Sequence, residues 1–502
     1  PAPVEPPPAQ PEPPTPERTE PPPAPEPPPS AGAAAKAEVD AKAQGAETRA
    51  DGRPSQHEGR FEFGSYGRMI VATDARGGPG RDADIAMRGT RMDESNYVEL
   101  ELRREDWFPQ TSTDTKVVAT LAIVNPIFHY DADFDVQMAV RNLFFEEQNL
   151  GLEGLSAWVG SRMVRGDDLY LLDFWPLDNL NTLGAGASYR HEAGTGVQLH
   201  MGVTQPDSPF FRQTVVRPAP LNQFGAVPVE LLDRQKFIGS LKLVHNQRFG
   251  DRSKPGPGIK GILYGEGHAL PAGTREPRAG ELEQLPSDGG FVVGAQFTGY
   301  TGERDSFFHA YFRYASGLAA YGQFATPGQL TLDKTTEGAH EILAALGGNF
   351  EAGMFGVMLG SYVRSFRDAS ERLNFEDVDE AVVLVRPTLF IAKMAGISLE
   401  GAFELVQRGV ITTPPGAEDP ANAFPEGPMV ARMWRIGVMP YLSPAGDGHF
   451  VRPQIRLIYN VAFRDPEAQA LYAPDHPFSR REVEHFLGLG AEWWFNSTSY
   501  GW

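Results

Sequence analysis

The sequence predicts an all-β protein, a closed transmembrane antiparallel β-barrel that follows a disordered, proline-rich N-terminal extension. The first observation is a repeated strand pattern, in which apolar residues alternate with polar, charged or aromatic ones, as in 197–204 and 397–405. Such alternation gives each strand one apolar face and one polar face. The second observation is that no stretch approaches the roughly 18 consecutive apolar residues of a membrane-spanning helix. Many such strands suit a barrel whose outside contacts lipid and whose inside contacts water.

The strand pattern recurs along most of the chain, and the 54 glycines and 44 prolines indicate many turns between the strands. Longer polar inserts at 205–233, 265–289, 412–430 and 464–483 are expected to be loops. Alternation of short turns and long loops is typical of outer-membrane barrels. The predicted strands are 61–71, 97–102, 115–124, 156–163, 169–175, 185–191, 197–204, 236–245, 291–298, 306–314, 354–364, 382–394, 397–406, 433–441, 450–461 and 486–495.

Residues 1–58 form the predicted extension, and residues 59–502 form the predicted barrel. Sixteen of the first 30 residues are proline, interleaved with Glu and Ala, and such a segment is expected to be an extended, polyproline-like spacer. The chain opens at Pro1 with neither an initiator methionine nor an apolar leader, so we expect a mature chain.

Composition and motifs argue against several functions. A formal charge of −20 without a basic patch predicts no nucleic-acid partner, and the absence of cysteine excludes disulfides and thiolate metal sites. His340-Glu341 lacks a second histidine at zinc-binding spacing, and Asp167-Asp168 is typical of a solvated turn. Gly256, Gly258 and Gly261 match a dinucleotide fingerprint, but prolines interrupt it. We therefore predict no catalysis, no metal and no cofactor.

Strand parity places aromatic and ionic side chains together on the face opposite the apolar one. The residues assigned in this way to the water-filled lumen include Tyr66, Arg68, Tyr97, Glu99, Glu101, Phe450, Arg452, Gln454, Arg456, Glu492 and Trp494. Aromatic rings stack on the C–H faces of sugars, whereas guanidinium and carboxylate groups hydrogen-bond their hydroxyls. A row of such weak sites would guide a linear sugar through the pore. The alternative is that the rings form interfacial girdles and that the charges only line a wet wall.

At these residues the chain resembles the maltoporin family of outer-membrane sugar porins. The resemblance covers residues 59–495 in order, and its most distinctive part is a W-x-G-x-R pattern followed by D-F-aromatic. The matching blocks are FEFGSYGR (61–68), NYVELEL (96–102), AWVGSRMVRGDDLYLLDFWPLDN (157–179), VRPQIRLIY (451–459) and AEWWF (491–495).

The resemblance implies an 18-stranded, trimeric barrel in the bacterial outer membrane that lets maltodextrin-like oligosaccharides diffuse passively. It implies an aromatic slide made of Tyr66, Tyr97, Phe450 and Trp494, with Trp175 at the constriction. It also implies a polar track made of Arg68, Glu99, Arg141 and Asp173, of which Arg141 rests on the resemblance alone. Residues 1–58 are then expected in the periplasm, as a tether or spacer.

The chain departs from the family pattern at several places. Phe450 stands where maltoporins usually have Trp, Trp175 stands where they have Tyr, and Gly166 stands where the enteric proteins have Arg, although Arg165 is adjacent. The central slide aromatic has no counterpart near Val293. An aromatic contributed by a neighbouring subunit is Phe128, Tyr130, Phe134 or none of them. These differences bear on the identity of the sugar more than on the fold.

Two other functions fit the same patterns. The first is a general diffusion porin without a sugar slide, for which permeation would ignore sugar identity. The second is a secreted β-rich carbohydrate-binding protein or glycosidase, whose outward faces would carry Lys, Glu and Asn in place of Val, Leu and Phe. The alternation favours the channel.

Overall fold

The computed structural model describes residues 57–497, with gaps at 125–129, 131, 133, 135, 222, 251–254, 303–304, 329, 371–376 and 409–428. Residues 1–56 of the predicted extension lie outside the described residues. Residues 412–428 of the predicted loop 412–430 also lie outside them. Among the described residues, no helix is both long and apolar enough to cross a membrane.

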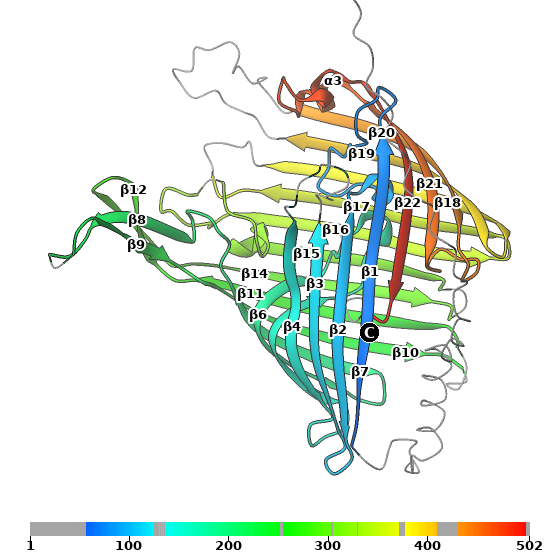
Figure 1. The fold of residues 1–502 in the computed structure, drawn as a ribbon, viewed down its shortest axis with the longest axis horizontal. Helices are drawn as coiled ribbons and strands as arrows, with labels where there is room; N and C mark the ends of the chain where they lie inside the picture. The colour runs from blue at the N-terminus through cyan, green and yellow to red at the C-terminus, as the bar shows by residue number, and fades with distance from the viewer. Residues whose placement is uncertain are drawn as a thin grey trace, which may run out of the picture. The chain divides into compact units, whose positions relative to one another are not determined.

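Eighteen strands pair into one closed antiparallel sheet, which confirms the predicted barrel (Figure 1). Each strand pairs with its neighbours along the barrel, and β1 pairs with both β2 and β22, so the sheet has no free edge. The strands are β1 (Glu58–Thr73), β2 (Tyr97–Phe108), β3 (Thr113–Val124), β4 (Gln137–Gln148), β5 (Leu155–Arg165), β6 (Asn179–Arg190), β7 (Thr195–Thr204), β10 (Lys236–Arg248), β11 (Gly258–Leu270), β14 (Asp288–Tyr300), β15 (Phe307–Gly317), β16 (His340–Ala352), β17 (Phe355–Arg367), β18 (Val378–Ala392), β19 (Ala395–Arg408), β20 (Met429–Leu442), β21 (Gln454–Arg464) and β22 (Val483–Phe495).

Short turns join the strands at one end of the barrel, and long connections join them at the other. The long insert after β7 holds a hairpin of β8 (Arg212–Pro218) and β9 (Ala226–Asp233), and the insert after β11 holds one of β12 (Gly273–Arg278) and β13 (Glu281–Leu285). Figure 1 shows β8, β9 and β12 together, away from the barrel wall. The amide of Gln213 hydrogen-bonds the backbone of Glu276, with both N···O distances at 2.7 Å, and so ties the two hairpins together.

The structure corrects some predicted elements. Residues 169–175 do not form a wall strand, because η2 (Tyr170–Leu172) turns the chain and Leu169 bridges only to Phe174. Three barrel strands were missed, β4, β11 and β16, as were the four hairpin strands within the predicted loops; β11 carries Gly261, Gly265 and Gly267 where an alternating pattern needs side chains. The predicted loop 265–289 is wrong over its first six residues, which belong to β11. The insert 464–483 contains α3 (Pro466–Ala470) and η6 (Pro477–Arg480).

The outward face of the barrel is apolar and the inward face is polar, as the alternation predicts. On β1, Phe61 and Val71 are 80% and 78% exposed, whereas Tyr66 on the opposite face is 3% exposed. On β22, Leu489 is exposed and Glu492 is buried. A water-soluble protein rarely exposes so continuous an apolar surface, but lipid tails accept it without cost.

An apolar core lies inside the barrel, around the connection between β5 and β6. This inward loop, residues 166–178, buries Leu169, Leu171, Leu172, Phe174 and Leu177. The residues of the far wall that pack in the same cluster include Leu343, Met358, Tyr362, Val382 and Leu384. The inward loop is therefore held across the lumen by apolar contacts, and it narrows the passage.

Replacing Leu489 by Arg tests which face contacts lipid. We expect a loss of barrel stability of about 2–4 kcal/mol, because an arginine near the bilayer midplane loses its hydration. Ser188→Arg, on the lining of a lumenal cavity, is the matched control and is expected to leave stability nearly unchanged. The measurement is the midpoint of thermal unfolding in detergent and in lipid vesicles. Equal effects of the two substitutions would contradict the assignment of faces.

Candidate channel lumen

Five of the predicted site residues lie side by side on the lumenal face of β2, β1 and β22. In the strand register, Tyr66 of β1 is paired with Glu99 of β2 and with Trp494 of β22. The next inward-facing residue, Arg68, is paired with Tyr97 and with Glu492. Directly paired residues share one face of a sheet. On each of the three strands a ring in one row is thus followed by an ionic group in the other, and we name the two rows the β2–β1–β22 rows.

Within these rows the rings and charges contact one another. The rings of Tyr66 and Tyr97 lie 5.9 Å apart, and the Arg68 guanidinium lies 5.5 Å from the Tyr97 ring centroid. Tyr97 donates its hydroxyl hydrogen to Glu99, and Arg141 of β4 places its Nε 3.6 Å from the same carboxylate. Arg141, a residue of the predicted polar track, is thus connected to the rows by its ion pair with Glu99, although β4 lies two strands away from β2.

Glu492 is the most heavily contacted acid in the rows. Its carboxylate lies 2.7 Å from Arg452 and 3.2 Å from Arg91, contacts Arg456, and accepts the Tyr170 hydroxyl at 2.9 Å. All of these groups are largely buried, so each cation needs this acid to offset its lost hydration. Parity predicted Glu492, Arg452 and Arg456 in the lumen, whereas Arg91 and Tyr170 come from loops and were missed.

The connection between β1 and β2 folds into the barrel and delivers Arg91. Its η1 turn (Arg91–Asp93) is held by Arg435 of β20, which lies 2.6 Å from Asp84 and 3.1 Å from Asp93. Asp82, Asp84 and Asp93 bring one carboxylate oxygen each within 4.8 Å of one another, a spacing that a cation could use. Arg435 already supplies positive charge to this cluster. The ion pairs of Arg435 with Asp84 and Asp93 therefore anchor the β1–β2 connection to β20.

Tyr170, on the inward loop, packs against two predicted slide residues. Its ring lies 5.3 Å from Phe450 and 6.2 Å from Trp494, edge-on to both, and the Arg91 guanidinium lies 4.4 Å from its centroid. The Arg452 guanidinium covers Trp494 at 4.0 Å. Phe450 and Trp494 of the predicted slide are thus packed against Tyr170 of the inward loop.

Asp173 ties the inward loop to the wall. It adopts the left-handed conformation with φ of 44°, and its carboxylate lies 3.7 Å from Arg68 and 3.5 Å from Arg91. Burial alone would raise the pKa of Asp173, but the guanidinium groups of Arg91 and Arg68 hold it below its usual value. Burial, together with the nearby Asp173, raises the pKa of Glu94 to about 7. Asp173 is therefore the carboxylate of this pair that stays fully ionised at neutral pH.

Two cavities border the inward loop and meet at Arg165. The outer cavity, of about 710 Å³, lies towards the long connections and is lined by Met87, Trp175 and Phe324 among others. The inner cavity, of about 560 Å³, is lined mostly by β3–β7 and β10. Arg165 lines both cavities, and its guanidinium lies 3.9 Å from the Trp175 ring centroid. We call Arg165, Trp175 and Arg141 the neck.

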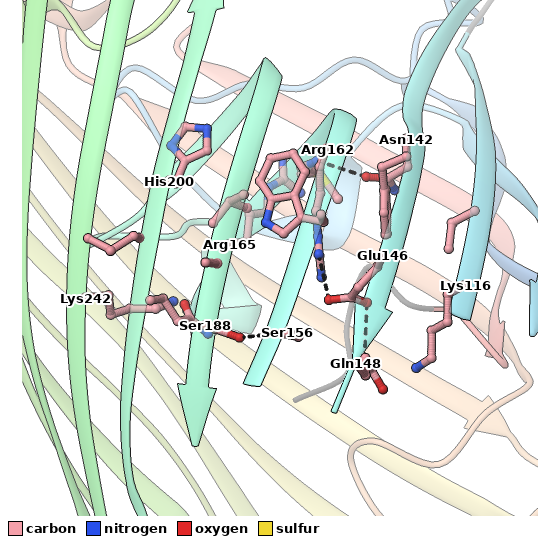
Figure 2. Close-up of a pocket in the computed structure, with 18 of the residues that line it drawn as sticks. Lys116, Asn142, Glu146, Gln148, Ser156, Arg162, Arg165, Ser188, His200 and Lys242 are labelled. Carbon is pink, nitrogen blue, oxygen red and sulfur yellow. Dashed lines mark hydrogen bonds and ion pairs between the residues drawn. The ribbon is translucent and has the colours of Figure 1, made fainter. Parts of the chain in front are cut away.

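The inner cavity holds aromatic and ionic groups that sequence reasoning did not assign. Figure 2 shows Arg162 and Glu146 joined across neighbouring strands, with His200 and Lys242 on strands further along the same wall, to the left in this view. Arg162 lies 3.0 Å from Glu146 and stacks over Phe144 and Trp158. The W-x-G-x-R pattern already contained Trp158 and Arg162, so their inward parity was the signal available.

Of the predicted site residues, Tyr66, Arg68, Tyr97, Glu99 and Trp494 form the rows, and Asp173 and Arg141 are joined to them by ion pairs. Trp175 lies apart, at the neck. Phe450 is connected to the rows by the Tyr170 ring, which packs against both Phe450 and Trp494. Val293 faces outward and is 47% exposed, so it marks no slide position. Tyr130 and Phe134 are exposed between β3 and β4, whereas Phe128 lies outside the described residues.

Replacing Glu492 by Gln tests whether the rows depend on this acid. We expect a loss of about 3–5 kcal/mol in unfolding free energy, because Arg452, Arg456 and Arg91 would keep their buried charges without compensation. Glu230→Gln, at an exposed ion pair on β9, is the control and is expected to change stability little. Thermal unfolding of the detergent-solubilised barrel measures both. Similar midpoints for the two variants would sink the role given to Glu492.

Acidification tests the anchoring of the inward loop by Asp173. Because the folded pKa lies below the usual 3.8, the ion pairs are fully present above that pH and are lost as the pH falls through the lower folded value. We expect steady single-channel current from pH 7 to pH 5 and increased current noise below about pH 3.8. Asp173→Asn is expected to be noisy already at pH 7. Quiet current in this variant would contradict the anchoring.

Comparison with known proteins agrees with this geometry. The family model described as LamB porin matches residues 61–495. No curated protein sequence matches the chain significantly. Similar solved structures include the outer membrane protein OpdK from Pseudomonas aeruginosa, at 11% identity and TM-score 0.41, covering 87% of this chain and 98% of that one. They also include OccAB1 from Acinetobacter baumannii, at 10% identity and TM-score 0.43, covering 87% and 96%.

These TM-scores are low, so the assignment rests on the family model and on the barrel itself. The family match covers more than half of the chain, and the outward faces carry Phe, Val and Leu where a secreted protein would carry Lys, Glu and Asn. The chain therefore belongs to the LamB porin family, and it is a non-enzymatic diffusion channel of the bacterial outer membrane.

Proposed function

We propose that this channel facilitates the diffusion of carbohydrates, of the maltodextrin-like oligosaccharide class. The observation that carries the proposal is the alternation of rings and ionic groups along the strands of the β2–β1–β22 rows, where Tyr66 is paired with Glu99 and Trp494, and Arg68 is paired with Tyr97. A sugar offers apolar C–H faces and a rim of hydroxyls. A wall that offers rings and charges at strand spacing complements both.

The neck is the place where a passing sugar would make its closest contacts. Trp175 and Arg141 line the outer cavity, and Arg165 lines both cavities. In this role Trp175 stacks on a sugar face, and Arg141 and Arg165 donate hydrogen bonds to hydroxyls. Tyr66, only 3% exposed, lies beneath Arg91 and holds that arginine through its hydroxyl oxygen.

Weak sites in series suit transport better than one tight site. Conduction requires each site to bind strongly enough to admit the sugar and weakly enough to release it. Tyr97, Trp175, Trp494 and Phe450 supply such sites along the lumen, and Arg68, Arg141 and Asp173 supply the polar partners, while the buried Glu99 holds the Tyr97 hydroxyl. A general diffusion pore would need none of this pairing.

Assembly and the extension belong to the same proposal. We place the channel in a homotrimer, in which the exposed Tyr130 and Phe134 can contact a neighbouring copy.

β1 begins at Glu58, at the end of the barrel that carries the short turns, and in outer-membrane barrels these turns face the periplasm. Residues 1–58 are accordingly proposed as a periplasmic tether. Unheated gel electrophoresis tests the trimer, and deletion of 1–56 with transport assays in cells tests the tether.

Sugar block of ion current in planar bilayers tests the proposed function. We expect maltodextrins to block the current at lower concentration than unrelated sugars, and Trp175→Ala to weaken the block roughly two- to tenfold, the range expected for one lost stacking contact of about 0.5–1.5 kcal/mol. Trp434→Ala is the control, because Trp434 is 56% exposed on the lipid face. Current that ignores sugar identity would show a general diffusion porin.

A further inference from the structure

The two lumenal cavities have the opposite charge balance to the chain as a whole. The chain carries a formal charge of −20. The outer cavity is lined by six Arg and three Glu residues. The inner cavity is lined by six Arg or Lys and by three Asp or Glu residues, and Arg165 is common to both. The linings of both cavities therefore carry an excess of positive charge although the protein is acidic.

Five of the six acids that line the cavities are paired with an Arg or Lys on the same lining, and the sixth, Glu266, contacts Tyr264 and His268. In the outer cavity, Glu341 accepts from Arg313 and from Arg364, and the latter also lies 2.9 Å from Glu380. In the inner cavity, Glu146 lies 3.0 Å from Arg162 and Asp178 lies 2.6 Å from Lys242. Each of these carboxylates is neutralised by its neighbour, so it offers little attraction to a passing cation.

Two of the lining cations lack such compensation. Within the described part of the chain, Arg88 in the outer cavity and Arg190 in the inner cavity form no ion pair with a carboxylate. Both are exposed. At the neck, Arg165 donates to Asn179 at 2.6 Å and lies over the Trp175 ring. Each of the two cavities thus holds one exposed arginine without an ion pair.

We propose that the channel selects for anions and that its preferred carbohydrates carry a negative charge, as a carboxylate or a phosphate group. This substrate class rests on the proposed carbohydrate function. A passage with low-dielectric walls and one sign of charge concentrates counter-ions, with potentials of several kT at the surface. Guanidinium groups bind carboxylate and phosphate through paired hydrogen bonds. At the neck, Trp175 contacts the sugar ring while Arg165 and Arg141 contact its charged substituent.

The zero-current potential across a planar bilayer in a KCl gradient tests the charge selectivity. We expect chloride to be more permeant than potassium in the wild-type channel. The double variant Arg88→Gln/Arg190→Gln is expected to lower the chloride-to-potassium permeability ratio by about twofold or more, because two uncompensated charges leave the field of the passage. Arg212→Gln, at an exposed ion pair on the β8–β9 hairpin, is the control and is expected to change nothing. Preference for potassium in the wild type would overturn the proposal.

Efflux of labelled solutes from proteoliposomes tests the substrate class. Glucose and glucuronic acid are matched in size and differ by one carboxylate, and we expect glucuronic acid to leave faster. Maltodextrin block of the current is measured on the same protein, so that the two proposals fail separately. Block without preference for the acid would remove only the anionic substrate class. Anion preference without any block would remove the carbohydrate function and leave an anion channel.

Discussion

Backbone hydrogen bonding in hydrocarbon is the constraint on which the rest of this structure depends. An unpaired amide or carbonyl costs several kcal/mol in lipid, so strands can cross a membrane only in a sheet that closes on itself. The pairing of β1 with β22 makes that closure. Once the sheet is closed, every strand must present mainly apolar residues to the outside, and most ionic groups of the wall point into the lumen. The rows of rings and charges follow from that confinement.

Confined charges need partners, and the loops supply them. The wall places Glu492 beside Arg452 and Arg456, but Arg91 and Tyr170 complete its shell from the β1–β2 connection and from the inward loop. The same two loops are fixed elsewhere, by Arg435 and by the apolar core. Electrostatics and apolar packing therefore determine one loop arrangement together, and the width of the passage follows from it.

The sequence predicted the wall better than the loops, for a physical reason. Alternation is a local property of a strand, so parity placed Tyr66, Glu99 and Trp494 on one face correctly. It failed for β11, where glycines remove the pattern, and at 169–175, where an apolar run packs inside the lumen and forms no strand. Arg91 and Tyr170 could not be predicted, because a loop residue reaches its site through contacts between segments that are distant in sequence.

The ionic groups of the lumen divide into two kinds by their degree of compensation. Arg452 and Arg456 are buried against Glu492, and Lys242 against Asp178, so they stabilise the wall and have little charge left for a solute. Arg88 and Arg190 are exposed on the linings of the two cavities, and in the part of the chain that the structure describes they form no ion pair with a carboxylate. An exposed guanidinium on each lining is suited to transient contact with a passing solute. The charges that do least for stability are thus the ones best placed to select what passes.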